Sequence, residues 1–176
     1  EWLVWYGGLE MVVPGNKRRS IPKNVELVVF DFDGVMTDDR VFVNQEGVEM
    51  VAANRRDGMG ITLLHKAGIR MMVLSSEKNP VVQARCNKLK LPVIQGIDEK
   101  AAVLRKYLLD NKISSDTVIY VGNDINDLPC FTEVGCAFAV ADAHPLALRQ
   151  ADIVLRHNGG YGAVRELCDI LLQSRS

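Results

Sequence analysis

The sequence has few residues that could build a metal site from nitrogen or sulfur ligands. Its 176 residues include three histidines and four cysteines. No two cysteines form a CxxC pair, and no histidine stands at metal-ligand spacing from them. We therefore expect no zinc site, and we expect free thiols in a reducing cytoplasm at Cys86, Cys130, Cys136 and Cys168.

The chain also lacks a long apolar run and an excess of charge of either sign. No apolar segment approaches the roughly 20 residues that a membrane-spanning helix needs. The 21 Lys and Arg residues nearly balance the 22 Asp and Glu residues, for a formal net charge of −1. A near-neutral chain does not favour a nucleic-acid-binding surface. Neither a nucleic acid nor a membrane is therefore expected as a partner.

The length fits a single domain with its own core, preceded by a segment of different character. Residues 1–24 contain two tryptophans, a Gly-Gly pair, a Pro-Gly-Asn stretch and a short basic run. Such a composition is typical of a linker, so we interpret residues 1–24 as a linker or as the tail of an upstream domain. The Glu at position 1 agrees with a fragment of a longer protein. Residues 25–176 are predicted to form the domain itself.

From Val25 onward, short apolar runs alternate with stretches of helical spacing. The apolar, β-branched runs predict strands at 25–32, 70–74, 117–121, 136–140 and 153–155. Helical periodicity between them predicts helices at 61–65, 80–89, 100–110, 127–134 and 163–172. This alternation predicts an α/β fold: a three-layer, Rossmann-like sandwich around a mostly parallel sheet. Residues 40–52 are the exception, because two apolar runs flank Asn44-Gln45-Glu46-Gly47 and predict a β-hairpin inserted after the first strand.

Polar residues stand where several of the predicted strands end. Asp31 and Asp33 follow the first strand, Ser75 follows the second, Lys100 opens a later helix, and Gly122–Asp127 follows the next strand. Ligands of open parallel sheets bind at the carboxyl ends of the strands. Each residue alone has an ordinary structural explanation as a turn, cap or surface residue. The four positions in this order favour a shared functional site.

These residue types suit phosphoryl transfer. Two carboxylates at i and i+2 can converge where the chain turns at Gly34, and oxygen ligands favour Mg²⁺. Asp31 can attack phosphorus to form an aspartyl-phosphate, and Asp33 can protonate the leaving oxygen and then activate water. Ser75 and Lys100 supply a hydroxyl donor and a fixed cation for the phosphoryl oxygens. We therefore expect a magnesium-dependent phosphatase.

With DxDGxxT after the first strand, then Ser, Lys and a Gly-acidic loop, the chain resembles the haloacid dehalogenase superfamily from about Val25 to Leu172. More narrowly, it is similar to the small phosphatases without a large cap domain. These include 3-deoxy-manno-octulosonate 8-phosphate phosphatases and nonulosonate 9-phosphate phosphatases, the latter similar to a domain fused to some acylneuraminate cytidylyltransferases. The segments 54–60, 140–145 and 159–166 support the narrower resemblance. It implies a sugar-acid phosphate substrate, such as a sialic acid precursor, and a fused or partner cytidylyltransferase domain.

The resemblance also implies individual roles and an assembly. Magnesium would be held by Asp31, by Asp33 through its backbone carbonyl, and by the Asn123/Asp124 loop, with Asp127 supporting the site. The substrate-binding set would be Glu77, Arg85, Lys88 and Gly34. The hairpin would build a homotetramer, and the glycine-rich C-terminal segment of one subunit could close a neighbour's site.

Two positions depart from the family pattern. Asn123 stands where many relatives carry Asp, which removes one negative charge from the metal loop. Tyr161 replaces the Arg often found in the C-terminal Gly-Gly-Arg-Gly segment, which puts an ionic contact across the interface in doubt.

Two other functions remain as alternatives. The first is a phosphatase-like oligomerisation module of a cytidylyltransferase; the presence of all four motif residues speaks against an eroded site. The second is a two-component receiver domain, which also places an Asp, a Ser/Thr and a Lys around magnesium. A receiver carries its phosphoacceptor on a later strand and lacks the i, i+2 carboxylate pair seen at Asp31 and Asp33.

Overall fold

A six-stranded parallel sheet forms the centre of the protein in the computed structural model, which describes residues 2–6, 9–13 and 19–174. Its strand order is β10-β9-β8-β3-β6-β7, and each neighbouring pair is parallel. The strands are β3 (Leu27–Phe30), β6 (Arg70–Leu74), β7 (Val93–Ile94), β8 (Val118–Gly122), β9 (Cys136–Ala139) and β10 (Ile153–Val154). The order reverses between β3 and β8, and such switch points are where open α/β sheets bind ligands.

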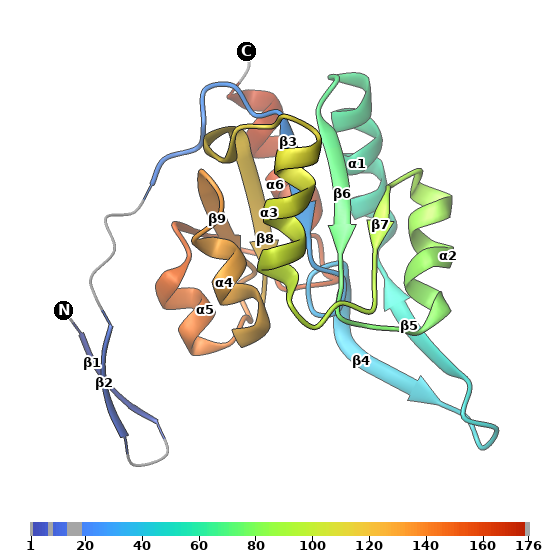
Figure 1. The fold of residues 1–176 in the computed structure, drawn as a ribbon. Helices are drawn as coiled ribbons and strands as arrows, with labels where there is room; N and C mark the ends of the chain where they lie inside the picture. The colour runs from blue at the N-terminus through green and yellow to red at the C-terminus, as the bar shows by residue number, and fades with distance from the viewer. Residues whose placement is uncertain (1, 7–8, 14–18, 175–176) are drawn as a thin grey trace.

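Helices cover both faces of this sheet (Figure 1). On one face α1 (Arg55–Lys66) packs against α6 (Ala163–Gln173), and α2 (Pro80–Leu89) packs beside α1. On the other face α3 (Lys100–Asp110) and α5 (Pro145–Gln150) flank the short α4 (Leu128–Phe131). Two 3₁₀ turns, Ser115–Thr117 and Ile125–Asp127, complete the helical elements. The predicted three-layer α/β sandwich is confirmed.

The core consists of the strand residues themselves. All four residues of β3 and all five of β8 are buried, as expected for strands covered on both faces by helices. The four cysteine thiols are buried and free, as predicted. Within the part of the chain described, no helix has the length and apolar character needed to cross a membrane.

The β-hairpin predicted after the first strand is present. It consists of β4 (Thr37–Val43) and β5 (Glu49–Ala53), which pair antiparallel and extend away from the sheet (Figure 1). The pairing register shifts between Thr37 and Val41, which marks a bulge at the base of the hairpin. The hairpin is thus anchored next to the residues that follow β3.

Several element boundaries differ from the sequence prediction. Helix α1 begins at Arg55 rather than near Ile61, because the Asn54 side chain caps it by accepting a hydrogen bond from the Arg56 N–H. The single helix expected at 127–134 is instead a 3₁₀ turn followed by α4. The two-residue strand β7 was not predicted, and no bounds were predicted for the six-residue helix α5 that follows His144.

Part of the predicted linker 1–24 forms two strands. β1 (Trp2–Tyr6) and β2 (Leu9–Val13) form an antiparallel pair, which the linker interpretation did not include. The Gly-Gly pair and residues 14–18 lie outside the described residues. Arg19 is attached to the domain, because its backbone N–H and guanidinium bind the buried Asp152 carboxylate at 2.7 and 2.8 Å.

Candidate active site

Asp31 lies at the switch point of the sheet, directly after β3. Its backbone N–H donates to the Val121 carbonyl of the neighbouring strand at 2.9 Å. The residue is only 5% exposed. Lys100, the first residue of α3, places its Nζ 2.8 Å from Asp31 Oδ1. Two residues 69 positions apart in the sequence thus form a buried ion pair at the carboxyl end of β3.

Asp127 completes a second ion pair with Lys100. The distance between Lys100 Nζ and Asp127 Oδ1 is 2.9 Å, and both side chains are buried. The other Asp127 oxygen accepts hydrogen bonds from the backbone N–H groups of Asn123 and Asp124 at 2.9 and 3.3 Å. Asp127 therefore fixes both the lysine and the loop that follows β8.

Tyr120 belongs to the same network, although the sequence analysis did not identify it as a site residue. Its hydroxyl donates to Asp127 Oδ1 at 2.7 Å from the buried strand β8. A signal was available: a tyrosine within an otherwise apolar, fully buried strand needs a polar partner for its hydroxyl.

Ser75 stands after β6 on the other side of Asp31. It is buried, and its hydroxyl oxygen accepts a hydrogen bond from the Glu77 backbone N–H at 3.1 Å. Its own N–H donates to the Ile94 carbonyl of the edge strand β7 at 3.0 Å. These bonds hold the Ser75 hydroxyl at the rim of the sheet.

The predicted catalytic residues meet in one open cavity of about 250 Å³ at the carboxyl end of the strands. Its lining consists of Asp31, Asp33, Asp39, Ser75, Ser76, Glu77, Lys100, Asn123, Asp124 and Asn126. Five of these ten residues are carboxylic acids, and Lys100 is the one cation. The structure therefore brings together all the predicted catalytic and metal-loop residues, with a large excess of negative charge.

Burial, with this negative charge adding to it, raises the pKa values of carboxylic acids at the site. Burial raises the pKa of Asp31 to about 8, with the charge of Asp127 adding to the effect and Lys100 opposing it. Burial, together with the charges of Glu77 and Asp39, raises the pKa of Asp33 to about 6. Burial lowers the pKa of Lys100, but Asp31 and Asp127 outweigh it and the net shift is upward. A pocket of this kind needs a further cation before it can accept an anionic phosphoryl group.

Comparison with known proteins agrees with this geometry. Residues 82–167 match the model of the haloacid dehalogenase-like hydrolases. The 3-deoxy-D-manno-octulosonate 8-phosphate phosphatase of Escherichia coli K12 is 39% identical over 151 residues, which cover 85% of this chain and 80% of the relative. The chain belongs to the haloacid dehalogenase-like hydrolases.

Solved structures of the family share the fold. A cobalt-bound deoxy-D-mannose-octulosonate 8-phosphate phosphatase from Haemophilus influenzae aligns with a TM-score of 0.83 and 34% identity, covering 87% of this chain and 90% of its own. A second structure is the 3-deoxy-D-manno-octulosonate 8-phosphate phosphatase of Moraxella catarrhalis in complex with magnesium, phosphate and KDO. It aligns with a TM-score of 0.84 and 29% identity, and the alignment covers 87% of this chain and 88% of the Moraxella chain. Together with its curated relatives, these matches identify this hydrolase as a phosphatase.

The oxygen atoms around Asp31 fit a hard divalent cation. Across the described residues, no group of three His, Cys, Asp or Glu side chains is placed to hold a metal ion. The predicted ligand set is mixed and does not need such a group, since it combines Asp31, the Asp33 carbonyl and the Asn123–Asp124 pair. All of these donors are oxygen, the ligand type that Mg²⁺ binds. Burial is the main cause that raises the pKa of Asp31, the negative charge of Asp127 adds to it, and a bound cation would favour the ionised carboxylate against both.

The predicted substrate-binding residues are not all at the cavity. Glu77 lines it, and one of its carboxylate oxygens accepts hydrogen bonds from the backbone N–H groups of Lys78 and Asn79 at 2.6 and 2.7 Å. Arg85 instead donates to the Asn54 carbonyl before α1 at 3.0 Å, and Lys88 is exposed on α2. Neither lines the cavity within this chain, so their role in substrate binding stays a prediction.

Gly34 lies where two segments approach the loop that follows β3 and contains Asp31. Its φ is +73°, and a Cβ there would collide with the Asn123 side chain. From the other side, a Cβ on Gly159 would collide with the Gly34 carbonyl oxygen. Gly34 therefore permits close packing around Asp31; contact with the substrate stays a prediction for it.

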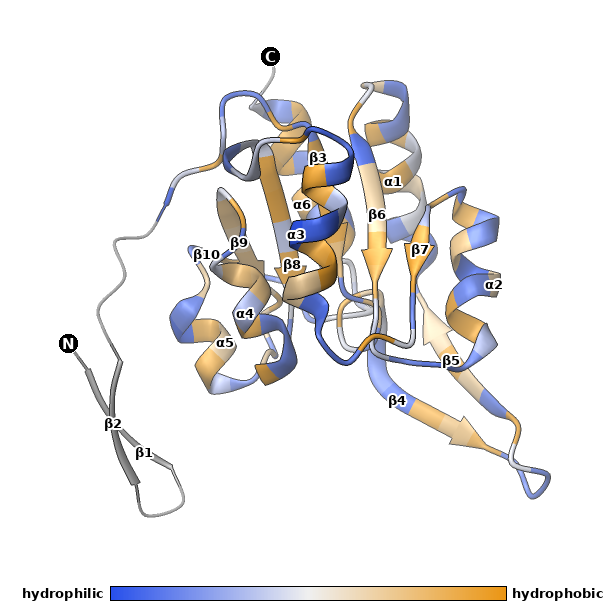
Figure 2. Ribbon diagram, viewed as in Figure 1, coloured by the Kyte–Doolittle hydropathy of each residue, from blue (hydrophilic) through white to orange (hydrophobic). Residues whose placement is uncertain are grey.

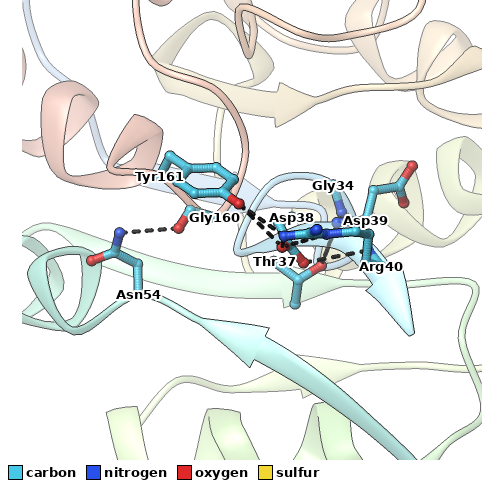
Figure 3. Close-up of polar contacts among 8 residues, drawn as sticks. All are labelled: Gly34, Thr37, Asp38, Asp39, Arg40, Asn54, Gly160 and Tyr161. Carbon is cyan, nitrogen blue, oxygen red and sulfur yellow. Dashed lines mark hydrogen bonds and ion pairs between the residues drawn. The ribbon is translucent and has the colours of Figure 1, made fainter. Parts of the chain in front are cut away.

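The glycine-rich C-terminal segment, residues 159–162, packs on the loop that follows β3 in its own chain (Figure 3). The Gly160 N–H donates to the Val35 carbonyl at 3.1 Å, and the Asn54 side-chain amide donates to the Gly160 carbonyl at 3.0 Å. Tyr161 places its hydroxyl 3.0 Å from an Arg40 nitrogen at the hairpin base. The tyrosine that departs from the family pattern thus makes an intramolecular contact beside the site.

Proposed function

We propose that this phosphatase is a magnesium-dependent phosphomonoester hydrolase that acts through an aspartyl-phosphate on a sugar-acid phosphate. 3-Deoxy-D-manno-octulosonate 8-phosphate is the first candidate substrate, because it is the substrate in the names of the relatives at 39% identity. A nonulosonate 9-phosphate is the second. The observation that carries the proposal is the buried Asp31–Lys100–Asp127 network at the base of an open, oxygen-lined cavity.

In the first half-reaction, an Asp31 carboxylate oxygen attacks phosphorus while the bond from phosphorus to the ester oxygen breaks. Asp33 donates its proton to the departing oxygen, so the sugar acid leaves as an alcohol. Lys100 and the Ser75 hydroxyl lie at the same rim and stabilise the charge that gathers on the phosphoryl oxygens. Asp127 holds Lys100 in place through the 2.9 Å ion pair.

In the second half-reaction, Asp33 takes a proton from a water molecule, which attacks the phosphorus of the aspartyl-phosphate. The bond between phosphorus and Asp31 breaks, which releases phosphate and restores the Asp31 carboxylate. A pKa of about 6 lets Asp33 give and take a proton near neutral pH. Mg²⁺ held by Asp31, the Asp33 carbonyl and the Asn123–Asp124 pair would supply positive charge that keeps Asp31 ionised and offsets the phosphoryl charge.

A steady-state screen of phosphate monoesters tests the substrate proposal. We expect kcat/KM for 3-deoxy-D-manno-octulosonate 8-phosphate to exceed that for p-nitrophenyl phosphate by roughly tenfold or more, because remote binding contacts act only on the larger substrate. Chelation should remove turnover and added Mg²⁺ should restore it. A higher kcat/KM for a nonulosonate 9-phosphate would move the assignment to the second candidate. Equal values for all substrates would contradict a sugar-acid phosphate substrate.

The alternative of a catalytically inactive module attached to a cytidylyltransferase is not favoured. An eroded site would have lost at least one member of the set, whereas Asp31, Asp33, Ser75 and Lys100 all line one cavity. A fused or separate cytidylyltransferase domain as a partner, and a cytoplasmic location, remain predictions.

The exposed hairpin supports a proposed homotetramer. Five apolar residues on β4, β5 and their turn are between 51% and 61% exposed: Val41, Phe42, Val43, Val48 and Met50. Figure 2 shows this apolar ribbon leading away from the domain. An apolar ribbon of this kind normally marks an interface. A second copy of the chain offers the same apolar ribbon in return, so we propose self-association through the hairpin.

Light scattering at micromolar concentration tests the assembly. We expect a mass four times the 19.5 kDa of one chain. The Phe42→Asp variant should have a lower mass, because it places a charge in the proposed interface. The matched control is Leu109→Asp, which changes an apolar side chain that is 78% exposed on α3, away from the hairpin. A monomeric wild type, or the same loss of mass in both variants, would contradict hairpin-mediated assembly.

A further inference from the structure

Asp39 adopts a backbone conformation that is unusual for its position. Its φ is +63°, in the left-handed region, although it lies within strand β4. Two other described non-glycine residues have positive φ, Lys90 and Lys112, and both lie within two residues of a helix end, where this conformation is common. Asp39 instead occupies the bulge between Thr37 and Val41. Bulges next to active sites often redirect a side chain.

The bulge separates Asp39 from its two neighbours. Asp38 and Arg40 bind each other, with 2.6 and 2.9 Å between guanidinium nitrogens and one carboxylate oxygen. Both also contact the Tyr161 hydroxyl. In Figure 3 the Asp39 carboxylate points away from this cluster. Within the described part of the chain, it accepts no hydrogen bond and forms no ion pair.

The bulge directs Asp39 to the catalytic cavity. It is the one residue of the described hairpin that lines this cavity. Asp39 is exposed to solvent, yet partial burial and the carboxylates of Asp124, Asp142 and Asp38 raise its pKa. Glycine would avoid both the backbone strain and the repulsion. Strained residues of this kind cluster at sites where function requires them.

We propose that Asp39 is a specificity-determining residue whose carboxylate accepts hydrogen bonds from hydroxyl groups of the substrate's leaving group. The inference rests on the proposed function. A carboxylate can only accept hydrogen bonds, and a polyhydroxylated sugar acid offers several donors. Asp39 also repels the carboxylate of such a substrate, so it favours the orientation that presents hydroxyl groups to the hairpin base. The backbone and electrostatic penalties are then offset only when a substrate with hydroxyl groups is bound.

The Asp39→Gly variant tests this proposal on two substrates. We expect kcat/KM to fall about tenfold or more with 3-deoxy-D-manno-octulosonate 8-phosphate, because a hydrogen bond to a charged acceptor is lost. With p-nitrophenyl phosphate, whose leaving group carries no hydroxyl group for Asp39 to bind, the change should stay below about twofold. The melting temperature should rise by about 2–4 °C, because glycine relieves the backbone strain at the left-handed position.

Two further variants separate recognition from loop geometry. Asp39→Asn keeps one acceptor oxygen and tolerates the left-handed conformation, so it should lose less kcat/KM than Asp39→Gly. Lys112→Gly is the matched control, since it relieves the same kind of strain (φ +54°) after α3, away from the cavity. It should leave the ratio of the two kcat/KM values unchanged.

Equal losses on both substrates, or no loss on either, would overturn the proposal. If the wild type prefers another hydroxylated phosphate ester to 3-deoxy-D-manno-octulosonate 8-phosphate, that ester takes its place in the comparison with p-nitrophenyl phosphate. A wild type that prefers another such ester therefore corrects the substrate assignment, while the Asp39→Gly ratio still decides the role of Asp39.

Discussion

Replacing Asp31 with Asn is expected to reduce kcat by on the order of 10⁴-fold or more, because an amide does not attack phosphorus. The substitution keeps the shape of the side chain, so the fold should remain. Burial and Asp127 raise the pKa of Asp31 to about 8, above its unfolded value, so the ionised group opposes folding. This loss of stability grows as the pH rises from about 4 towards 8. Without metal at pH 8, Asp31→Asn should therefore melt no lower than the wild type.

The measurements for this variant are initial rates with excess Mg²⁺ and thermal unfolding with and without the metal. Asp98→Asn is the matched control, because it removes a carboxylate from an exposed position just before α3. We expect this control to have the activity of the wild type. Residual turnover of Asp31→Asn within tenfold of the wild type would identify another nucleophile.

Replacing Lys100 with Met should damage both stability and catalysis. The change leaves Asp31 and Asp127 buried without their shared cation, and breaking such a pair costs about 3–5 kcal/mol. The loss should be larger at pH 8 than at pH 5, because the stranded carboxylates can take up protons at the lower pH. We also expect kcat to fall by about 10²–10³-fold, since a cation at the phosphoryl oxygens is lost.

Lys106→Met on the same helix is the control for this experiment. Lys106 forms an exposed ion pair with Asp110 at 2.7 Å, and such surface pairs contribute little to stability. It should unfold within about 1 kcal/mol of the wild type and keep full activity. Denaturant titration at both pH values gives the free energy of unfolding. A Lys100→Met variant as stable and active as Lys106→Met would contradict the role given to the buried network.

Much of the fold was predictable because the buried strands and the longer helices carry clear periodic patterns. The expected bounds of β6, α2 and α3 agree with the structure. The start of α1 was missed because Gly58 and Gly60 weaken its helical pattern, while tertiary packing against α6 stabilises it. The short elements β7 and α5 contain too few residues for a period to be recognised.

The site was predictable to the extent that its residues follow strands. Asp31, Ser75 and Lys100 come together because the carboxyl ends of parallel strands meet at one edge of the sheet. Asp39 could not be predicted, since its exposure to the cavity depends on a bulge that the sequence pattern does not reveal. The placement of Arg85 against α1 depends on how the helices pack in three dimensions. Spacing on a helix indicates a shared face but not what that face contacts.

The central claim is that phosphoryl transfer proceeds through Asp31. The most direct test is rapid acid quenching of the Asp33→Asn variant after mixing with a substrate that carries a radiolabelled phosphoryl group. The substrate is p-nitrophenyl phosphate, whose leaving group departs as a phenolate without the proton that Asp33 otherwise donates. The variant therefore still forms the aspartyl-phosphate but lacks the base that activates water, so the intermediate should accumulate. We predict close to one labelled phosphoryl group per active site, located on Asp31 by peptide mass spectrometry. Label on another residue would contradict the account. So would inversion of configuration at phosphorus in the wild-type reaction, because transfer through a covalent intermediate takes two displacements and gives overall retention.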